Sequence, residues 1–350
     1  MKTSAYEPHP GSACGFLAPL LRRVGLGAAV LSGAVLNAGP ASAEDLTCGE
    51  QPADASRIVV AGGSLVEILY DLEEESRIIA VDRTSNYPAS ARDLPQIGYV
   101  RNVSAEGLLS VEPSFVLGEH DTGPPEVLEQ LENLGIDLLL VPEEFSVAGI
   151  RDKIRCVAAA IGRSEAGEEL AARLLADLAP DIAQQIESGE AGAEAPAGIV
   201  LLGLREGAPV AAGRATSGQG LLDMAGARNL MEFEGWKPVS VEAMAAARPE
   251  FIVIPERGVR MAGGLDELLE HPALRLTPAA EYRRVISMDG MAMLGFGPRT
   301  AAAAARLREQ LLEDGLLARG IRGEQAVQGT LPAVDDSGRS ALRSLLADGE

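Results

Sequence analysis

The chain has 350 residues, of which 47% are apolar, 23% charged and 3% aromatic, and its formal net charge is −21. That length and apolar content are enough to bury a large core, which excludes intrinsic disorder for the chain as a whole. The excess of 51 acidic over 30 basic residues argues against nucleic acid or an anionic membrane surface as the main partner.

The first 43 residues have the pattern of an export signal. Arg22 and Arg23 form a positive region, an apolar run of small residues follows at 24–39, and the tripeptide ending at Ala43 has the A-x-A form of a cleavage site. We therefore expect residues 1–43 to be a signal peptide, cleaved near Ala43, and the mature protein to be periplasmic. The paired arginines leave both the Sec and the twin-arginine routes open.

Two cysteines follow the predicted cleavage site. Cys48 lies in the mature N-terminal segment at 44–56, and Cys156 lies in a helical pattern at 147–161. An even pair in an oxidising compartment is a candidate disulfide. The spacing does not show whether their Cα atoms lie within bridging distance, so the bonded and free forms both fit the sequence.

Short apolar runs alternate with helical patterns along the mature chain, which is typical of an α/β fold with a mainly parallel sheet. The expected strands lie at 58–61, 78–81, 115–118, 137–141, 199–202, 251–254 and 285–288.

The helical stretch at 164–188 is the longest in the chain, and a small, polar linker follows it. The predicted organisation is an N-terminal α/β lobe at 57–161, an interdomain helix and linker at 162–195, a C-terminal α/β lobe at 196–316 and a flexible tail at 317–350.

A short repeat supports two similar lobes. Ser104 and Glu106, followed by Pro113 and Phe115, recur 136 residues later as Ser240, Glu242, Pro249 and Phe251. Each copy predicts a capped helix, a proline stop and a buried strand. Two such lobes would enclose a cleft at the carboxyl ends of their strands.

The loop at 82–102 is long, polar and interrupted by prolines, as binding loops often are. Tyr99 and Arg101 are two residues apart, so in an extended segment both side chains point to the same side. A phenol binds ferric iron as phenolate, an adjacent guanidinium favours that charged form, and tyrosine is an attested haem ligand. The same spacing also fits a structural tyrosine beside a surface arginine.

The segment from Leu94 to Arg101, Leu-Pro-Gln-Ile-Gly-Tyr-Val-Arg, and the Ser-Ala-Glu-Gly run that begins at Ser104 resemble the periplasmic haem-binding proteins of bacterial haem ABC importers. Further segments that carry the resemblance are Arg57–Ser64, Gly123–Pro125, Ala211–Gly213 and Met291–Gly297. The resemblance covers about 57–312. It implies two similar three-layer lobes with mainly parallel central sheets, joined by one long interdomain helix, as in class III periplasmic binding proteins. It also implies a carrier of haem b rather than an enzyme.

The resemblance assigns candidate roles to individual residues. Tyr99 is the expected iron ligand, with Tyr87 as runner-up and His120 as a candidate second ligand. Arg101, Arg205 and Arg299 are candidate partners of the haem propionates. Glu67 and Glu242 are the candidate residues for docking on an inner-membrane ABC permease, and an outer-membrane haem receptor system would act upstream.

Two other functions remain open from the sequence. A binding protein of the same fold could carry a corrinoid or a ferric siderophore, neither of which needs a phenolate ligand. An exported hydrolase is the third hypothesis. Two observations count against it: the sequence shows no pair of a nucleophile and a general base, and only His120 and His271 remain after export.

Overall fold

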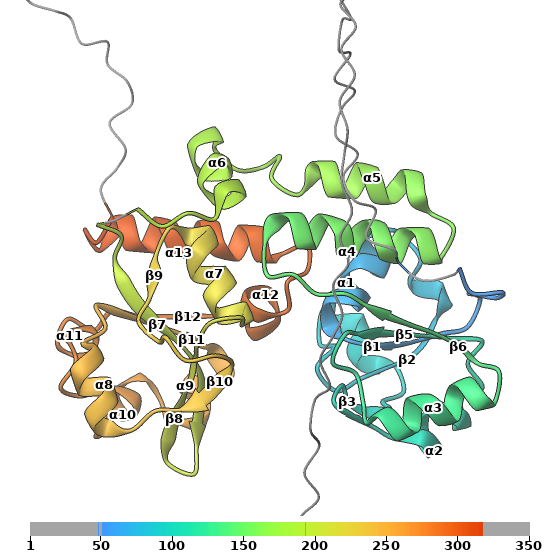
Figure 1. The fold of residues 1–350 in the computed structure, drawn as a ribbon, viewed down its shortest axis with the longest axis horizontal. Helices are drawn as coiled ribbons and strands as arrows, with labels where there is room; N and C mark the ends of the chain where they lie inside the picture. The colour runs from blue at the N-terminus through green and yellow to red at the C-terminus, as the bar shows by residue number, and fades with distance from the viewer. Residues whose placement is uncertain (1–47, 49–50, 193, 318–350) are drawn as a thin grey trace, which may run out of the picture. The chain divides into compact units, whose positions relative to one another are not determined.

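The computed structural model describes residue 48 and residues 51–192 and 194–317. The predicted signal peptide and, from 318 on, the predicted tail lie outside these residues. Within the described ranges, no helix combines the length and apolar character needed to cross a membrane. The described residues form two α/β lobes, shown in Figure 1 in blue to green and in yellow to red.

The N-terminal lobe has a four-stranded parallel sheet in the order β2-β1-β5-β6. Its strands are β1 (Ile58–Ala61), β2 (Ile78–Val81), β5 (Phe115–Glu119) and β6 (Asp137–Val141), and its main helices are α1 (Gly63–Asp71), α2 (Ala105–Ser110), α3 (Pro125–Asn133) and α4 (Val147–Ala160). Alternate residues of β1 face opposite sides, as in any strand. Ile58 and Val60 pack in the cluster that contains α1 and α4, whereas Val59 and Ala61 pack in the cluster that contains α2 and α3. The sheet is therefore covered on both faces.

The C-terminal lobe repeats this architecture with a mixed sheet. Its strands are β7 (Ala197–Arg205), β8 (Ala208–Ala212), β9 (Arg228–Asn229), β10 (Trp236–Pro238), β11 (Phe251–Pro255) and β12 (Val285–Met288). The sheet order is β10-β8-β7-β11-β12, and β9 also pairs with β7. The pairs formed by β7 with β9 and β11 and by β11 with β12 are parallel, and those of β8 with β7 and β10 are antiparallel.

Helices cover both faces of this second sheet as well (Figure 1). They are α7 (Ser217–Ala225), α8 (Val241–Ala247), α9 (Glu256–Met261), α10 (Leu265–Leu269), α11 (Pro278–Glu281), α12 (Gly290–Leu294) and α13 (Thr300–Glu313). Residues of α7 and α13 join the cluster that also contains α1 and α4, so one apolar core runs through both lobes. The α/β class with parallel central strands is confirmed.

The two copies of the sequence repeat fold alike. Ser104 and Ser240 are the N-caps of α2 and α8, and each side chain accepts a hydrogen bond from the backbone N–H three residues later. Phe115 and Phe251 then begin the buried strands β5 and β11. Both side chains are at most 1% exposed.

The expected continuous helix at 164–188 is wrong. The chain forms α5 (Ser164–Arg173) and α6 (Pro180–Ser188), separated by a turn. The residue before a proline disfavours the helical region, and Ala179 is extended, with ψ 142°. Pro180 therefore begins a second helix instead of continuing the first.

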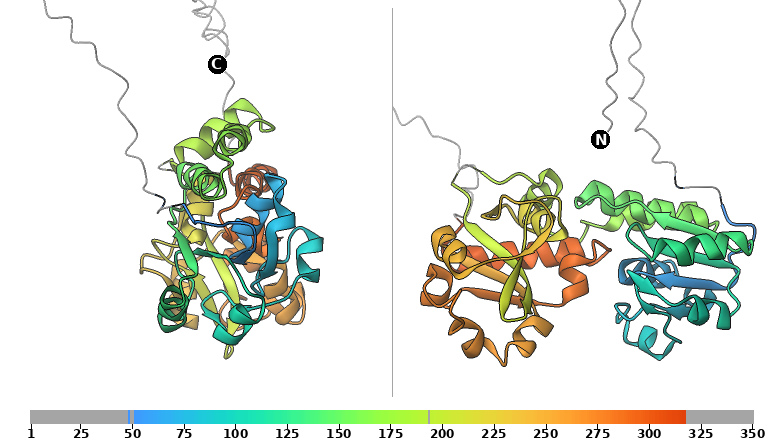
Figure 2. Two further views of the ribbon diagram at one scale, coloured as in Figure 1. Left: turned by 90° about the vertical axis from the view of Figure 1, so that its right-hand side faces the viewer. Right: turned by 60° about the horizontal axis from the view of Figure 1, so that its bottom comes forward.

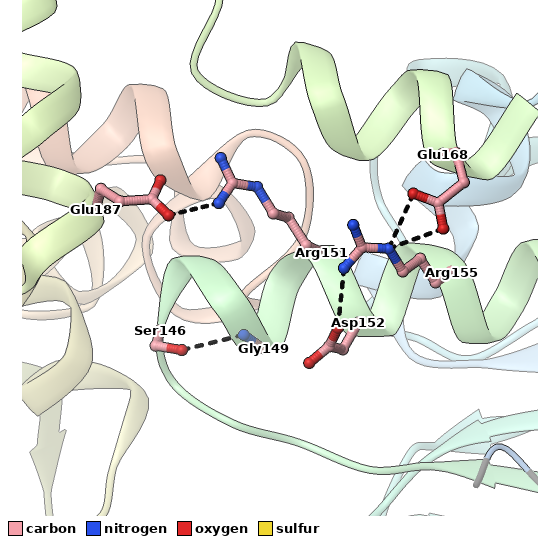
Figure 3. Close-up of polar contacts among 7 residues, drawn as sticks. All are labelled: Ser146, Gly149, Arg151, Asp152, Arg155, Glu168 and Glu187. Carbon is pink, nitrogen blue, oxygen red and sulfur yellow. Dashed lines mark hydrogen bonds and ion pairs between the residues drawn. The ribbon is translucent and has the colours of Figure 1, made fainter. Parts of the chain in front are cut away.

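Side-chain contacts tie both of these helices to α4 (Figure 3), and Figure 2 shows the ribbons of the same segment from two further sides. Ser146 caps α4 by accepting a hydrogen bond from the N–H of Gly149 at 3.0 Å. Arg155 of α4 donates to Glu168 of α5 at 2.9 Å, and Arg151 donates to Glu187 of α6 at 2.6 Å. Helix α4 thus serves as the common support for the segment that connects the lobes.

Candidate functional site

The loop at 82–102 is anchored at its start by a buried carboxylate. Asp82 is 0% exposed and accepts hydrogen bonds from the N–H of Gly62, the N–H and hydroxyl of Thr84 and the hydroxyl of Ser85, at 2.6–3.0 Å. The loop then turns back, and the N–H of Arg83 donates to the carbonyl of Gly98 at 2.7 Å. These contacts hold the end of the loop next to the carboxyl end of β2.

The end of this loop is a small antiparallel hairpin. Strand β3 (Gly98–Tyr99) pairs with β4 (Asn102–Val103). Gly98 has φ +111°, a region open to glycine, and a Cβ there would lie 2.9 Å from the carbonyl oxygen of Asn102. Val100 and Val103 are 3% and 4% exposed and pack into the core, so the hairpin has a fixed inner side.

The outer side of the hairpin carries Tyr99 and Arg101. Tyr99 is 38% exposed, and Nη1 of Arg101 donates to its phenol oxygen at 2.6 Å. Nη2 of Arg101 forms an ion pair with Asp121, in the segment after β5. The N–H of Gly123 donates to the carbonyl of Val100, which fixes that segment against the hairpin. Asp121 therefore orients the guanidinium, and the guanidinium is directed at the phenol oxygen.

Two other expected site residues lie exposed at strand ends. His120 directly follows β5 and precedes Asp121, so its backbone lies beside the hairpin. Arg205 is the last residue of β7, where the chain turns into β8. Neither side chain has a hydrogen-bond or ion-pair partner among the residues that the structure describes. Both are available to a ligand.

Glu67, one of the two residues that the resemblance implies for docking, is not an exposed carboxylate. Helix α1 begins at Gly63, which places Glu67 in its second turn, and the residue is 4% exposed. Its Oε1 accepts from Nη2 of Arg299 at 2.5 Å, and burial raises the pKa of the carboxyl more than this arginine lowers it. A docking role needs an exposed side chain, so that expectation for Glu67 is wrong.

The same contact occupies Arg299. Besides Glu67, its guanidinium pairs with Asp289 at 3.2 Å and lies 3.7 Å from the centroid of the Tyr87 ring. Tyr87 is 45% exposed and has this cation against one face. Arg299 thus joins α1 to the residues before α13 instead of presenting a free guanidinium to an anionic ligand.

A second buried polar network lies next to this ion pair. Lys153 of α4 is 2% exposed, and its Nζ donates to Glu143 at 2.5 Å and to Ser64 and the carbonyl of Gly295 at 3.3 Å. Ser64 in turn donates to Glu119 at 2.8 Å. Burial raises the pKa of Glu143 to about 7, against the opposing effect of Lys153, and burial also raises the pKa of Glu119.

The two cysteines are joined. Cys48 and Cys156 form a disulfide with their Cα atoms 5.3 Å apart, which ties residue 48 to α4. A cavity of about 230 Å³ adjoins the bond and is lined by Glu143 and Lys153. A second cavity, of about 460 Å³, lies at the C-terminal lobe. Neither of these two cavities is lined by Tyr99.

The structure indicates two further residues, Asp121 and Glu106, that the sequence alone did not single out as site residues. Asp121 orients Arg101, and only its place after a buried strand could have indicated it. Glu106 is the exposed first-turn carboxylate of α2, as Glu242 is of α8. The 136-residue repeat pairs Glu242 with Glu106, so that signal was already present in the sequence.

Comparison with known proteins agrees with this architecture. The family described as periplasmic binding protein matches residues 58–292. A periplasmic heme-binding protein, BhuT, solved in complex with two hemes, is 36% identical and superposes with a TM-score of 0.67 over 75% of this chain and 99% of its own.

Two curated relatives match at lower identity. An ABC transporter substrate-binding lipoprotein of Bacillus subtilis, YvrC, is 24% identical over 78% of this chain and 84% of its own. A vitamin B12-binding protein of Photorhabdus laumondii is 26% identical over 74% of this chain and 89% of its own. This chain belongs to the periplasmic binding protein family, whose members bind substrates for transport and are not enzymes.

Proposed function

We propose that this protein captures haem in the periplasm through a bond between the Tyr99 phenolate and ferric iron, and delivers it to an ABC permease. The observation that carries the proposal is the hydrogen bond of 2.6 Å from Arg101 to the phenol oxygen of an exposed tyrosine. A donor directed at that oxygen stabilises it when it carries negative charge. Tyr99 lies on the exposed side of a hairpin whose other side is anchored by the buried Val100 and Val103, so its ring can receive a planar ligand.

Further support comes from the relatives. The BhuT structure contains haem, and its sequence is 36% identical to this chain where the two match. Arg205 and Arg101 are the candidate partners of the haem propionates, because propionates are anionic and both residues are exposed, Arg101 while it also contacts Tyr99 and Asp121. His120 remains the candidate second iron ligand, since it is exposed beside the same hairpin.

A corrinoid is the second candidate ligand, because the Photorhabdus laumondii relative is named as a vitamin B12-binding protein. Titration of the purified protein with hemin and, separately, with cyanocobalamin distinguishes the two. We expect hemin to give a high-spin ferric tyrosinate absorption spectrum and cyanocobalamin to give no binding. Binding of cyanocobalamin without any spectral change on hemin addition would establish the corrinoid function instead.

Docking on the permease is assigned to Glu106 and Glu242. Both are exposed carboxylates in the first turns of the two repeated helices, one on each lobe. We expect the double substitution Glu106→Ala, Glu242→Ala to lower haem uptake in cells at least about tenfold and to leave the hemin titration unchanged. The matched control is Glu129→Ala, Glu267→Ala, which removes one exposed carboxylate from each lobe. Equal uptake in both variants would refute the assignment.

Export through a cleaved signal peptide is part of the same proposal. We expect N-terminal sequencing of the periplasmic protein to begin at Glu44. A protein that retains residues 1–43 would contradict it.

A further inference from the structure

The two lobes differ at the amino-terminal edges of their sheets, on the side opposite the carboxyl strand ends. In the register of the sheets, Ile58 pairs with Phe115 and Gly198 pairs with Phe251. Because the two phenylalanines are equivalent in the repeat, Ala197 is the counterpart of Arg57. The backbone N–H of both residues makes an equivalent contact, with Ser114 in one lobe and Glu250 in the other.

In the N-terminal lobe, the side chain of Arg57 fills the space at this edge of the sheet. The guanidinium of Arg57 donates to the carbonyl of Val111 at 2.6 Å and to that of Glu112 at 2.9 Å, at the end of α2. In the C-terminal lobe, Ala197 has no side chain that can reach the end of α8. A cavity of about 460 Å³ lies at this place and is lined by Ala197.

The cavity is lined by three arginines from three elements. Arg228 comes from β9, Arg248 is the C-cap of α8 and Arg284 precedes β12. Helices α8 and α11 lie at the outer side of this lobe in Figure 1, away from α12. Arg248 has φ +50° and its counterpart Glu112 has φ +48°, so the same backbone conformation carries opposite charges in the two lobes.

None of the three guanidiniums has a hydrogen-bond or ion-pair partner within the described part of the chain. This contrasts with Arg283, which pairs with Asp266 at 2.7 Å. The one carboxylate in the lining, Glu250, accepts the N–H of Ala197 at 2.7 Å. Arg284 is held in place by the ring of Tyr282, whose centroid is 4.8 Å from the guanidinium carbon.

We propose that this cavity is a binding site for a phosphoryl group, separate from the haem site and independent of the proposed haem function. Three guanidiniums against one occupied carboxylate attract a multiply charged oxyanion, and the planar fork of arginine matches the oxygens of a phosphate. The chain has 51 acidic residues, so a group of three arginines without an acidic partner contrasts with the negative net charge of the protein. The volume is in the range of small-molecule pockets, so the phosphoryl group of a larger molecule also fits.

Calorimetric titration with inorganic phosphate and with pyrophosphate tests the site at constant ionic strength, and flotation with phosphatidylglycerol vesicles tests a lipid headgroup. We expect the substitution of Arg228, Arg248 and Arg284 by Gln to weaken binding at least about tenfold. The matched control replaces Arg257, Arg275 and Arg306 by Gln, which are exposed arginines outside the cavity, and should change binding less than about twofold.

The titrations and the vesicle flotation distinguish the possible ligands. Binding of the free anions identifies a soluble phosphoryl ligand, and binding of vesicles alone identifies a lipid headgroup, provided that the cavity variant loses it. The single variant Arg284→Lys keeps the positive charge but lacks the planar guanidinium. It takes the place of the triple variant in these titrations if the triple variant does not fold. Binding of none of the three probes, or equal weakening in the control, overturns the proposal.

Discussion

Each lobe contains a tyrosine followed two residues later by an arginine, and the two pairs have different geometries. In the N-terminal lobe, Arg101 donates to the hydroxyl of Tyr99 at 2.6 Å. In the C-terminal lobe, Arg284 lies over the face of the Tyr282 ring, 4.8 Å from its centroid. Tyr282 follows α11, and Arg283 next to it has φ +53°, whereas Tyr99 lies in a hairpin strand. Identical spacing therefore gives a directed hydrogen bond in one backbone and a stacked pair in the other.

The largest difference between the two pairs should appear in haem affinity. We expect Tyr99→Phe to weaken hemin binding about 1,000-fold, or ~4 kcal/mol, because it removes the oxygen that would bond to iron. Tyr282→Phe removes the hydroxyl of a still more exposed tyrosine, 60% against 38%, and should change the affinity less than about twofold. Dissociation constants from hemin titration measure both. A similar loss in the two variants would show that the hairpin geometry does not select the ligand.

The N-terminal lobe should also depend on its disulfide for stability. Cys48 and Cys156 close a loop over a sequence separation of 108 residues. Replacing both by Ser is expected to lower the free energy of unfolding by about 3 kcal/mol, since the unfolded chain gains freedom. Chemical denaturation measures this, with hemin affinity expected to change less than about threefold. Wild-type protein that is equally stable with and without reductant would contradict it.

A smaller effect is expected from the two arginines. Arg101→Gln should weaken hemin binding about tenfold, or ~1.4 kcal/mol, because the phenolate loses its charged donor. Arg284→Gln is the matched change and should leave hemin affinity within about twofold. If Arg101→Lys restores most of the affinity, the charge matters more than the direction of the donor.

The smallest expected effect is on the pH dependence of stability. The pKa of Glu143 is raised by burial from 4.5 to about 7, so the folded protein holds this proton more tightly than the unfolded chain. Its contribution is complete below pH 4.5 and is lost as the pH rises to about 7. Relative to Glu143→Gln, the wild type should become progressively less stable across that interval. Parallel curves for the two proteins would refute this.

The fold could largely be predicted because its signals are local. Apolar runs of four or five residues gave the buried strands, and Ser104 and Ser240 are caps whose hydrogen bonds span three residues. The break between α5 and α6 is not evident from the sequence pattern, because helix-forming residues continue on both sides of Pro180 and the pattern at 164–188 predicts a single helix.

The site was harder to predict, because its geometry depends on contacts distant in the sequence. The position of Glu67 gave no sign of Arg299, which is 232 residues away and buries it. The spacing of Tyr99 and Arg101 recurs at Tyr282 and Arg284, so the long polar loop and the resemblance around the first pair, and not the spacing, indicate the site. The contact of Asp121 with Arg101, and the replacement of Arg57 by Ala197 in the second lobe, follow only from the three-dimensional structure and the pairing of its strands.

Resonance Raman spectroscopy of the ferric haem complex tests the central claim most directly, because it detects vibrations of an iron–phenolate bond. We predict these bands in the wild type and in Tyr282→Phe, and their complete loss in Tyr99→Phe. Persistence of the bands in Tyr99→Phe, with loss in Tyr87→Phe, would place the iron on the other exposed tyrosine of the loop and contradict the account.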